Sequence, residues 1–374
     1  MKVHSVPGGF RPKVVICSPA LDAVSGVSTH AGLLFASTLK DDFELLHFQV
    51  GSEGRLESVP GKLLRLLTSP LQLAWLILRQ RPAIVHLNTS MDHKAYWRDS
   101  VLFMVAKALG AKVLQQVHGG VMPADMYPRL PVCAALLRRM LRASDAVSIL
   151  SRDEQVAYQA FCPEAHLVRI PNAIDCATLP ENLRQRGPDA PLRLVYIGRL
   201  IAEKGLFEIL AAVAQLRCSG RRLRLDIAGS GPALPALLAQ TAQHRLGETV
   251  RFHGPVAGLG KARLWQGADI LVFPTYHPEG LPYALLEAMA AGTPAITCAV
   301  GAIPDVMRHE VHGLFVMPHD VPMLAAAIAR LDDDRPLLEA MRRACRDRVT
   351  SEFSAERLAR DFNALYAAML GQAT

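Results

Sequence analysis

The stretch 268-ADILVFPTYHPEGLPYALLEAMAAGTPAI-296 decides the fold. It opens with an apolar run, 268–275, that is typical of a buried strand, and a loop follows. Pro282 lacks an N–H group, which suits the first turn of a helix, so a helix is predicted to begin near Leu281–Pro282. A second short apolar run, 293–298, comes next. Strand, helix and strand in this order predict two parallel strands joined by a crossover helix.

The same alternation extends outward from this stretch. Further strands are predicted at 13–19, 83–89, 111–118, 146–150, 165–172, 192–198, 222–229 and 249–254. Strands that alternate with helices predict parallel sheets covered by helices. At 374 residues the chain is too long for one ordinary core, and the polar stretch 181–191 predicts a linker. We therefore expect an α/β fold with two doubly wound domains, 1–185 and 186–353, and a last helix within 354–374.

Composition narrows the class of protein. With 51% hydrophobic and 20% charged residues, the chain is typical of globular proteins. Its seven cysteines include no C-x-x-C pair, which argues against a zinc site or a disulfide framework and fits a reducing compartment. The first 20 residues lack the apolar core of a signal peptide, and the apolar run 71–78 is too short to span a bilayer. A cytoplasmic location is expected.

Positive charge is concentrated in the first half. Residues 1–186 contain 21 Lys and Arg against 15 Asp and Glu, a net charge of +6, whereas the remainder carries 20 against 19. A basic half can serve nucleic acid, an anionic membrane surface or an anionic substrate. No helix-turn-helix or zinc-finger pattern accompanies it, so nucleic acid is not expected as a partner.

Glu279 and Glu287 lie on either side of the predicted helix start. The free N–H groups and positive dipole of a helix N-terminus suit an anion such as a diphosphate. Glu287 would lie about 7.5 Å along the helix axis from Pro282 and could accept both hydroxyls of a ribose. Glu279, followed by Gly280 and Leu281, would meet a sugar at the other end. The alternative is an acid favoured near a helix N-terminus and a solvated helix acid.

The loop 196-YIGRLIAEKG-205 offers two cations, Arg199 and Lys204, at the end of another strand. In open α/β sheets, ligands bind outside the carboxyl ends of the strands. A leaving diphosphate must be neutralised, and Arg together with Lys does this without a metal ion. The alternative is that both are ordinary surface cations.

Two strand-end positions in the first half are weaker candidates. Gly26 would allow the backbone to approach a phosphate at the N-terminus of a helix that starts near Val27. His118 ends a predicted strand, is followed by two glycines, and could hold a sugar hydroxyl. A plain turn glycine and a satisfied structural histidine are the alternatives.

Two other motifs do not carry chemistry. The segment 228-AGSGPAL-234 has Leu234 where a dinucleotide fingerprint has its third glycine, so we interpret it as a tight turn. No D-x-D metal motif is present, and the acidic run 332–334 is expected to be a solvated turn or a helix cap.

Together these motifs resemble glycosyltransferase family 4, a family of retaining enzymes with the GT-B fold. The segment 198-GRLIAEKG-205 resembles the donor-phosphate loop, which implicates Arg199 and Lys204. The segment 279-EGLPYALLEAMAAGTPAI-296 matches the E-x7-E signature, which implicates Glu279 at the donor sugar and Glu287 at the ribose.

The resemblance continues in the first half and is imperfect in two places. The segment 25-SGVSTHAG-32 resembles the glycine loop of the family and implicates Gly26, and His118 falls where the family places a histidine near the transferred sugar. The departures from the family are Ala173 after Asn172, where the usual motif is Asn-Gly, and Ala302 and Asp305, where it is Gly-Gly-x-x-Glu.

This resemblance implies two Rossmann-like domains that face each other across a cleft, with the donor bound mainly by the second domain and the last helix crossing back to the first. It implies transfer of a hexose from a UDP- or GDP-linked donor with retention at the anomeric carbon. No cofactor and no metal ion are expected. The donor base, the sugar and the acceptor stay open.

The acceptor is expected to be a polyprenyl-diphosphate-linked oligosaccharide in surface or exopolysaccharide synthesis. Residues 55–81 combine many leucines and Trp75 with five basic residues, a composition that can lie in an anionic membrane interface on the cytoplasmic face. The alternative is that these leucines pack into the core. A soluble small-molecule acceptor, a non-catalytic sugar-nucleotide binding protein and a dinucleotide-dependent epimerase are the competing functions.

Overall fold

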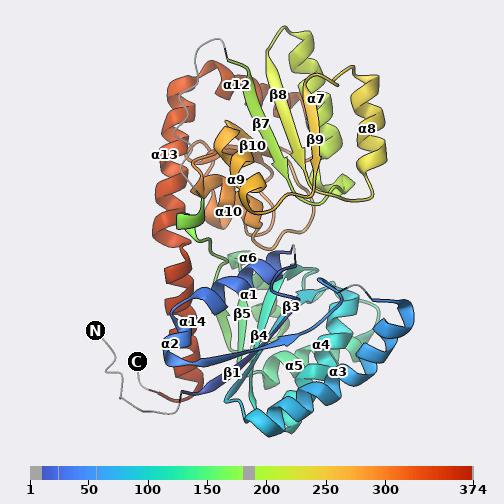
Figure 1. Cartoon of the computed structure of the whole chain (residues 1–374), viewed down its shortest axis with the longest axis vertical. Helices are drawn as coiled ribbons and strands as arrows, with labels where there is room; N and C mark the ends of the chain where they lie inside the picture. Colours follow the sequence, from blue (N-terminus) through green and yellow to red (C-terminus); the bar gives the residue numbers. More distant parts are fainter. Residues whose placement is uncertain (1–10, 24, 56, 180–189, 373–374) are drawn as a thin grey trace. The chain divides into compact units, whose positions relative to one another are not determined.

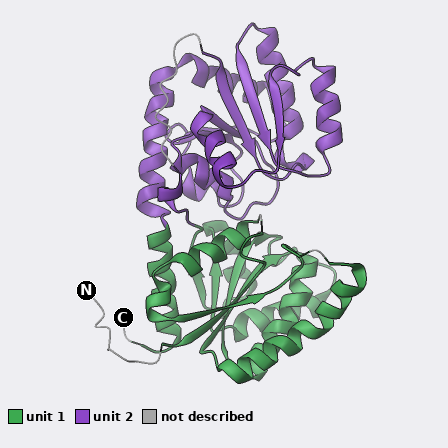
Figure 2. Cartoon of the chain, viewed as in Figure 1, with its two compact units in different colours: residues 1–172, 355–374 green, residues 173–354 purple. Residues whose placement is uncertain are grey.

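The computed structural model describes residues 11–23, 25–55, 57–179 and 190–372 (Figure 1). The chain divides into two compact units (Figure 2). Unit 1 comprises Met1–Asn172 and Ala355–Thr374, and unit 2 comprises Ala173–Ser354.

Unit 1 is built on a six-stranded parallel sheet with the order β2-β1-β3-β4-β5-β6. The strands are β1 (Lys13–Ser18), β2 (Glu44–Gln49), β3 (Ile84–Met91), β4 (Lys112–Gly120), β5 (Ala146–Ile149) and β6 (Leu167–Arg169). The helices are α1 (Gly26–Ala36), α2 (Leu39–Asp42), α3 (Val59–Gln80), α4 (His93–Ala108), α5 (Pro131–Ala143), α6 (Arg152–Phe161) and α14 (Ala355–Met369).

Unit 2 has a second six-stranded parallel sheet, with the order β12-β11-β10-β7-β8-β9. The strands are β7 (Leu192–Ile197), β8 (Leu223–Ala228), β9 (Val250–Gly254), β10 (Ile270–Phe273), β11 (Ala295–Thr297) and β12 (Gly313–Phe315). The α-helices are α7 (Leu206–Cys218), α8 (Leu234–Gln243), α9 (Gly258–Gly267), α10 (Tyr283–Ala290), α11 (Ile303–Val306), α12 (Val321–Asp333) and α13 (Arg335–Glu352).

The opening stretch of the sequence folds as its pattern predicts. Residues of β10 are buried along their whole length, and α10 begins at Tyr283 with Pro282 as its N-cap residue. All ten predicted strands are present, but two observed strands were not predicted. The pattern of β2 starts with a glutamate and lacks β-branched residues, and β12 is only three residues long and starts with glycine.

The strand orders place a topological switch point in each unit. In unit 1, β1 is paired with both β2 and β3. In unit 2, β7 is paired with both β8 and β10, so successive strands run to opposite sides of β7. Ligands of doubly wound sheets bind where the strand order reverses, outside the carboxyl ends. The loops that follow β7 and β10 are therefore the first place to look for a site in unit 2.

The unit boundary lies nearer the N-terminus than the sequence-based boundary at 185/186. Ile174 N–H donates a hydrogen bond of 2.9 Å to Phe353 O, so the segment after Asn172 is tied to the end of α13. Most of the predicted linker, 181–189 of 181–191, lies outside the described residues.

The acidic run 332–334 is a helix cap, as expected, and also an ion-pair site. Asp334 accepts a hydrogen bond from Leu337 N–H at the start of α13, and Asp332 and Asp333 both pair with Arg221.

The last helix, α14, completes the core of unit 1. Its Tyr366 hydroxyl lies 2.7 Å from Nδ1 of His86 on β3, and the ring of Phe362 stacks on the His86 ring at 5.3 Å. All three side chains are fully buried. Residues from the two ends of the chain thus share one core.

Candidate functional site

Two loops meet at the switch point of unit 2. Lys204, which lies between β7 and α7, forms an ion pair with Glu279, which lies between β10 and α10. The Thr275 hydroxyl donates a further hydrogen bond of 2.9 Å to the same Glu279 oxygen. Lys204 is 8% exposed. The structure therefore brings together two of the predicted site residues that are 75 positions apart in the sequence.

Backbone hydrogen bonds brace these two loops against each other. The carbonyl of Glu203 accepts from the N–H groups of Tyr276 at 2.9 Å and of His277 at 3.1 Å. The Tyr276 hydroxyl donates to Ala202 O at 3.1 Å. Gly205, which has a φ of +75°, lies so close to Pro274 that a Cβ atom would stand 2.4 Å from its carbonyl oxygen. The Lys204–Glu279 pair is thus held by a fixed frame.

The backbone of Arg199 is fixed by a hydrogen bond, whereas its side chain is exposed. The buried Tyr196 hydroxyl donates a 2.8 Å hydrogen bond to Arg199 O, which anchors the loop at the end of β7. Burial raises the pKa of Tyr196, with a further raising contribution from Glu279 and a lowering one from Arg199. Arg199 and Glu279 therefore both lie within electrostatic reach of the same phenol.

The loop after β11 supports the Gly280 and Leu281 segment. Ala302 N–H donates to Gly280 O at 3.2 Å, and Leu281 is buried. At Gly301, where φ is +54°, a Cβ atom would stand 1.9 Å from Glu279 O. The sequence pattern could not predict this close approach, because the two backbones belong to separate segments of the chain. Alanine at position 302, where the family usually has glycine, does not disturb this loop, because the contact with Gly280 O is made by the backbone N–H group of Ala302.

Glu287 lies on α10, and among the described residues it forms no hydrogen bond with Lys204 or Glu279. It is 6% exposed. Lys261 donates to its Oε1 at 2.6 Å, and Trp265 Nε1 donates to its Oε2 at 3.2 Å. Burial raises the pKa of Glu287, and the Coulombic attraction of Lys261 opposes that rise. Glu287 is thus a buried acid held by two donors, and the alternative of a solvated helix acid is wrong.

Glu287→Gln is expected to weaken binding of a nucleoside diphosphate by about 1–3 kcal/mol. The variant keeps the shape but removes the charge, and its amide nitrogen would face another donor, either Lys261 or Trp265. Titration calorimetry with UDP and GDP measures the effect. Glu248→Gln, which changes an exposed acid two residues before β9, is the control. Equal affinities in both variants would remove Glu287 from the ribose site.

Gly26 is the first residue of α1, one position before the predicted start. The helix is capped by Ser25, whose hydroxyl oxygen accepts from Ser28 N–H at 3.2 Å. Gly26 follows β1 at the switch point of unit 1, which is the position that the resemblance implies for a phosphate. That role stays a prediction.

His118 lies near the end of β4 and has a fixed ring. Its Nε2 lies 2.8 Å from Asn88 Oδ1, while Asn88 Nδ2 donates to Cys17 O at 3.1 Å. Because the amide oxygen can only accept, Nε2 of His118 carries the proton and Nδ1 is left as an acceptor. Burial and the neighbouring His86 lower the pKa of His118 to about 3. The His118 ring is therefore neutral near pH 7, and its role toward a sugar hydroxyl stays a prediction.

Two further histidines, which sequence reasoning missed, surround His118. The ring of His30, on α1, lies 4.9 Å from the His118 ring, and His86 bonds Gln116 Oε1 at 2.8 Å. Burial lowers the pKa of His86 to about 3 and lowers that of His30 well below its usual value. Neither stood at a strand end, so no pattern singled them out.

The free energy of unfolding of unit 1 is expected to fall as the pH falls below about 6.5. Buried His30 and His86 stay neutral when folded but bind protons when unfolded, so each contributes up to about 1.4 kcal/mol per pH unit. Urea unfolding of a Trp265→Phe protein, whose remaining Trp75 and Trp97 report unit 1, measures it. In this background, His86→Gln should reduce the slope of the free energy of unfolding against pH by up to about 1.4 kcal/mol per pH unit, which corresponds to one proton. Identical slopes with and without His86→Gln would show that His86 is not a buried neutral group.

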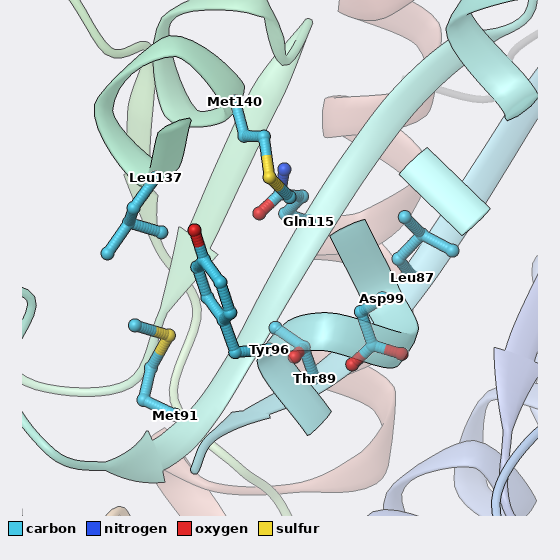
Figure 3. Close-up of a pocket in the computed structure, with 8 residues that line it drawn as sticks. All are labelled: Leu87, Thr89, Met91, Tyr96, Asp99, Gln115, Leu137 and Met140. Carbon is cyan, nitrogen blue, oxygen red and sulfur yellow. The ribbon is translucent and has the colours of Figure 1, made fainter. Parts of the chain in front are cut away.

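A small cavity in unit 1 is too small to be the substrate site. It has a volume of about 20 Å³. Figure 3 shows its lining side chains, which come from β3, α4, β4 and α5: Leu87, Thr89, Met91, Tyr96, Asp99, Gln115, Leu137 and Met140. This is about the room that one water molecule needs, far less than a sugar.

Two family models together match most of the chain. The model described as "Glycosyltransferase Family 4" matches residues 33–178, and the one described as "Glycosyl transferases group 1" matches residues 181–348. The first match covers five of the six strands of unit 1, β2 to β6, and the second covers all six strands of unit 2. The second contains every predicted site residue of unit 2.

Curated relatives are similar at about one third identity. A GDP-mannose-dependent alpha-(1-6)-phosphatidylinositol monomannoside mannosyltransferase of Mycobacterium tuberculosis is 30% identical over 270 residues, 68% of this chain and 69% of that protein. A glycogen synthase of the same organism is 36% identical over 196 residues. That match spans 52% of this chain and about half of the relative, 47%.

Solved structures share the fold. Sucrose-phosphate synthase from Thermosynechococcus elongatus superposes with a TM-score of 0.80 at 20% identity, covering 96% of this chain and 100% of that one. HepE of Anabaena in complex with UDP-glucose has a TM-score of 0.75 at 16% identity, covering 95% and 99%. At these identities the likeness concerns architecture.

Proposed function

Because this chain belongs to the family 4 glycosyltransferases of GT-B fold, we propose that it transfers a hexose from a UDP- or GDP-linked donor to a glycan acceptor with retention at the anomeric carbon. The observation that carries the proposal is the Lys204–Glu279 pair at the switch point of unit 2. There a cation and an acid meet where doubly wound sheets bind nucleotides, and Arg199 lies in the same loop after β7 as Lys204.

The proposed reaction breaks the bond between the anomeric carbon and the diphosphate oxygen. The diphosphate leaves with the bonding electron pair, and Arg199 and Lys204 stabilise the negative charge that develops on it. The acceptor hydroxyl attacks from the same face and passes its proton to the departing diphosphate. Glu279 binds a hydroxyl of the transferred sugar. In this scheme no metal ion and no cofactor take part.

A donor screen tests this function directly. Purified protein is incubated with UDP- and GDP-hexoses, thermal stabilisation selects the donor, and release of UDP or GDP is followed with and without acceptor. NMR of the product then gives the anomeric configuration, which should equal that of the donor. Stabilisation without any UDP or GDP release would favour a non-catalytic binding protein, and bound NAD would favour a dinucleotide enzyme.

The acceptor is proposed to be lipid-linked because α3 presents an uncovered apolar stripe. Leu73 and Ile77 pack into the core of unit 1 with Val15 and Val85. The opposite face of the helix carries residues three or four positions apart that are 60–70% exposed: Leu63, Leu67, Leu71, Trp75 and Leu78. The alternative that these leucines fill the core is therefore wrong for this stripe. No helix in the described ranges is long and apolar enough to span a bilayer.

Cations flank the stripe and make an anionic bilayer its proposed partner. Arg79 lies over the Trp75 ring at 5.1 Å, and Lys62 lies one turn from the start of α3. Arg65 is less available, because it is paired with Glu57 at 3.0 Å. A helix with an apolar face and basic neighbours is typical of interfacial binding. The mycobacterial relative is a phosphatidylinositol monomannoside mannosyltransferase, which supports a lipid-linked class of acceptor here.

Leu67→Ser/Leu71→Ser/Trp75→Ser is expected to abolish sedimentation with phosphatidylglycerol vesicles, because it removes most of the stripe while donor binding in unit 2 stays intact. Charge reversal at Lys62 and Arg79 should have the same effect at low salt, each cation contributing about 1 kcal/mol. The matched control is Leu238→Ser/Leu259→Ser, which alters exposed leucines of unit 2. If wild-type protein does not sediment at low salt, a soluble acceptor becomes the better proposal.

A further inference from the structure

Helix α9 presents two donors to one buried acid. Lys261 and Trp265 are four positions apart and so lie on one face of α9. Lys261 Nζ is 2.6 Å from Oε1 of Glu287 and Trp265 Nε1 is 3.2 Å from Oε2. Trp265 is 1% exposed, so its indole is a rigid part of the core. Neither residue was singled out from the sequence.

Beside these two contacts, each carboxylate oxygen of Glu287 can accept one further hydrogen bond. An ionised carboxylate offers about four lone-pair positions, two on each oxygen. The lysine takes one on Oε1 and the indole takes one on Oε2. One position on each oxygen remains, which matches the two neighbouring hydroxyls of a ribose.

Lys261 is the cation that stabilises the charge of Glu287. The helix α13 packs on α10, and two of its arginines have other partners: Arg346 donates to Ala290 O at 2.6 Å, and Arg342 pairs with Asp269 at 2.9 Å. Burial favours the protonated form of Glu287, and the ion pair with Lys261 opposes it. Without this lysine the remaining donor would be the neutral Trp265.

We propose that Lys261 is a positioning residue for the nucleoside: together with Trp265 it holds Glu287 charged and aimed so that its two remaining lone-pair positions accept the ribose hydroxyls. This inference rests on the proposed function and on the prediction that Glu287 binds the ribose of the donor. It assigns to α9 a part in donor recognition that the E-x7-E signature does not contain.

The test is the pH dependence of nucleotide affinity in Lys261→Met. UDP and GDP are titrated calorimetrically into wild-type and variant proteins between about pH 5.5 and pH 8, and the ratio of variant to wild-type Kd is taken at each pH so that ligand ionisation cancels. The ratio should rise by about tenfold or more toward low pH, because Glu287 becomes protonated in the variant. Lys261→Arg should restore a flat ratio.

Trp265→Phe is the matched comparison in the same contact. Trp265→Phe removes a neutral donor, so the ratio of its Kd to the wild-type Kd should be raised by a similar factor at every pH. If the Kd ratio of Lys261→Met is also independent of pH, the proposal is overturned, because a lysine with a purely structural role would weaken binding equally at every pH. If wild-type protein binds neither UDP nor GDP, the proposed function fails first; if wild type binds and Glu287→Gln binds equally well, only the ribose assignment and this inference fail.

Discussion

Lys204→Met is expected to lower kcat by about 10²-fold or more, the scale for losing one group that stabilises charge in a transition state. Arg199→Ala should have an effect of the same order. Lys204 is nearly buried and its ammonium group lies 5.1 Å from the Phe273 ring, so no solvent cation can take its place. Single-turnover release of UDP or GDP measures the chemical step directly.

The same variant should also be less stable, and this effect must be separated from catalysis. Removing Lys204 leaves Glu279, whose side chain is 10% exposed, without its cation, at a cost of up to about 3–5 kcal/mol. Lys204→Met/Glu279→Gln removes both charges, so it should recover much of the lost Tm but none of the lost kcat. Lys40→Met, an exposed lysine on α2, serves as the control. Turnover near that of wild type in both Lys204→Met and Arg199→Ala would disprove the assignment.

Gly301→Ala is expected to lower kcat by about 10²-fold although it adds one methyl group. The Cβ atom would stand 1.9 Å from Glu279 O, so the loop that carries Glu279 must move by about 1 Å. A displacement of that size at a positioned group can cost about 10²-fold in rate. The left-handed φ of +54° adds a strain of about 1–2 kcal/mol.

Gly220→Ala separates strain from displacement. Gly220 also has a left-handed φ, +82°, but no atom lies within 4 Å of the position of its Cβ. Both variants should therefore lose a similar amount of Tm from backbone strain, and only Gly301→Ala should also lose kcat. Equal kcat values in the two variants would show that the loop after β11 does not position Glu279.

The sequence predicted the features that depend on neighbouring residues. Strand-helix alternation gave ten of the twelve strands, and Pro282 marked the start of α10 because its effect is local. The family signature also singled out Lys204 and Glu279, which form an ion pair in the structure.

What the sequence could not predict depends on contacts between distant segments. Lys261 and Trp265 look like ordinary residues of a surface helix until α10 is placed beside them. His86 sits inside a strand, where its bond to Tyr366, 280 positions later, has no local signature. The exposed stripe of α3 belongs to the same class, because a leucine-rich helix does not reveal which of its faces is covered.

The chain order of unit 1 has a consequence for synthesis. His86 and the strands around it are translated early, but Phe362 and Tyr366 leave the ribosome only after all of Ala173–Ser354 has been made. At ordinary rates of elongation this is a delay of roughly 10–40 s. During that interval the nascent sheet lacks the helix that covers His86, and it is exposed to chaperones and to aggregation. Unit 2 is contiguous and can fold while it emerges, so the part of the chain that is made first is the last to be completed.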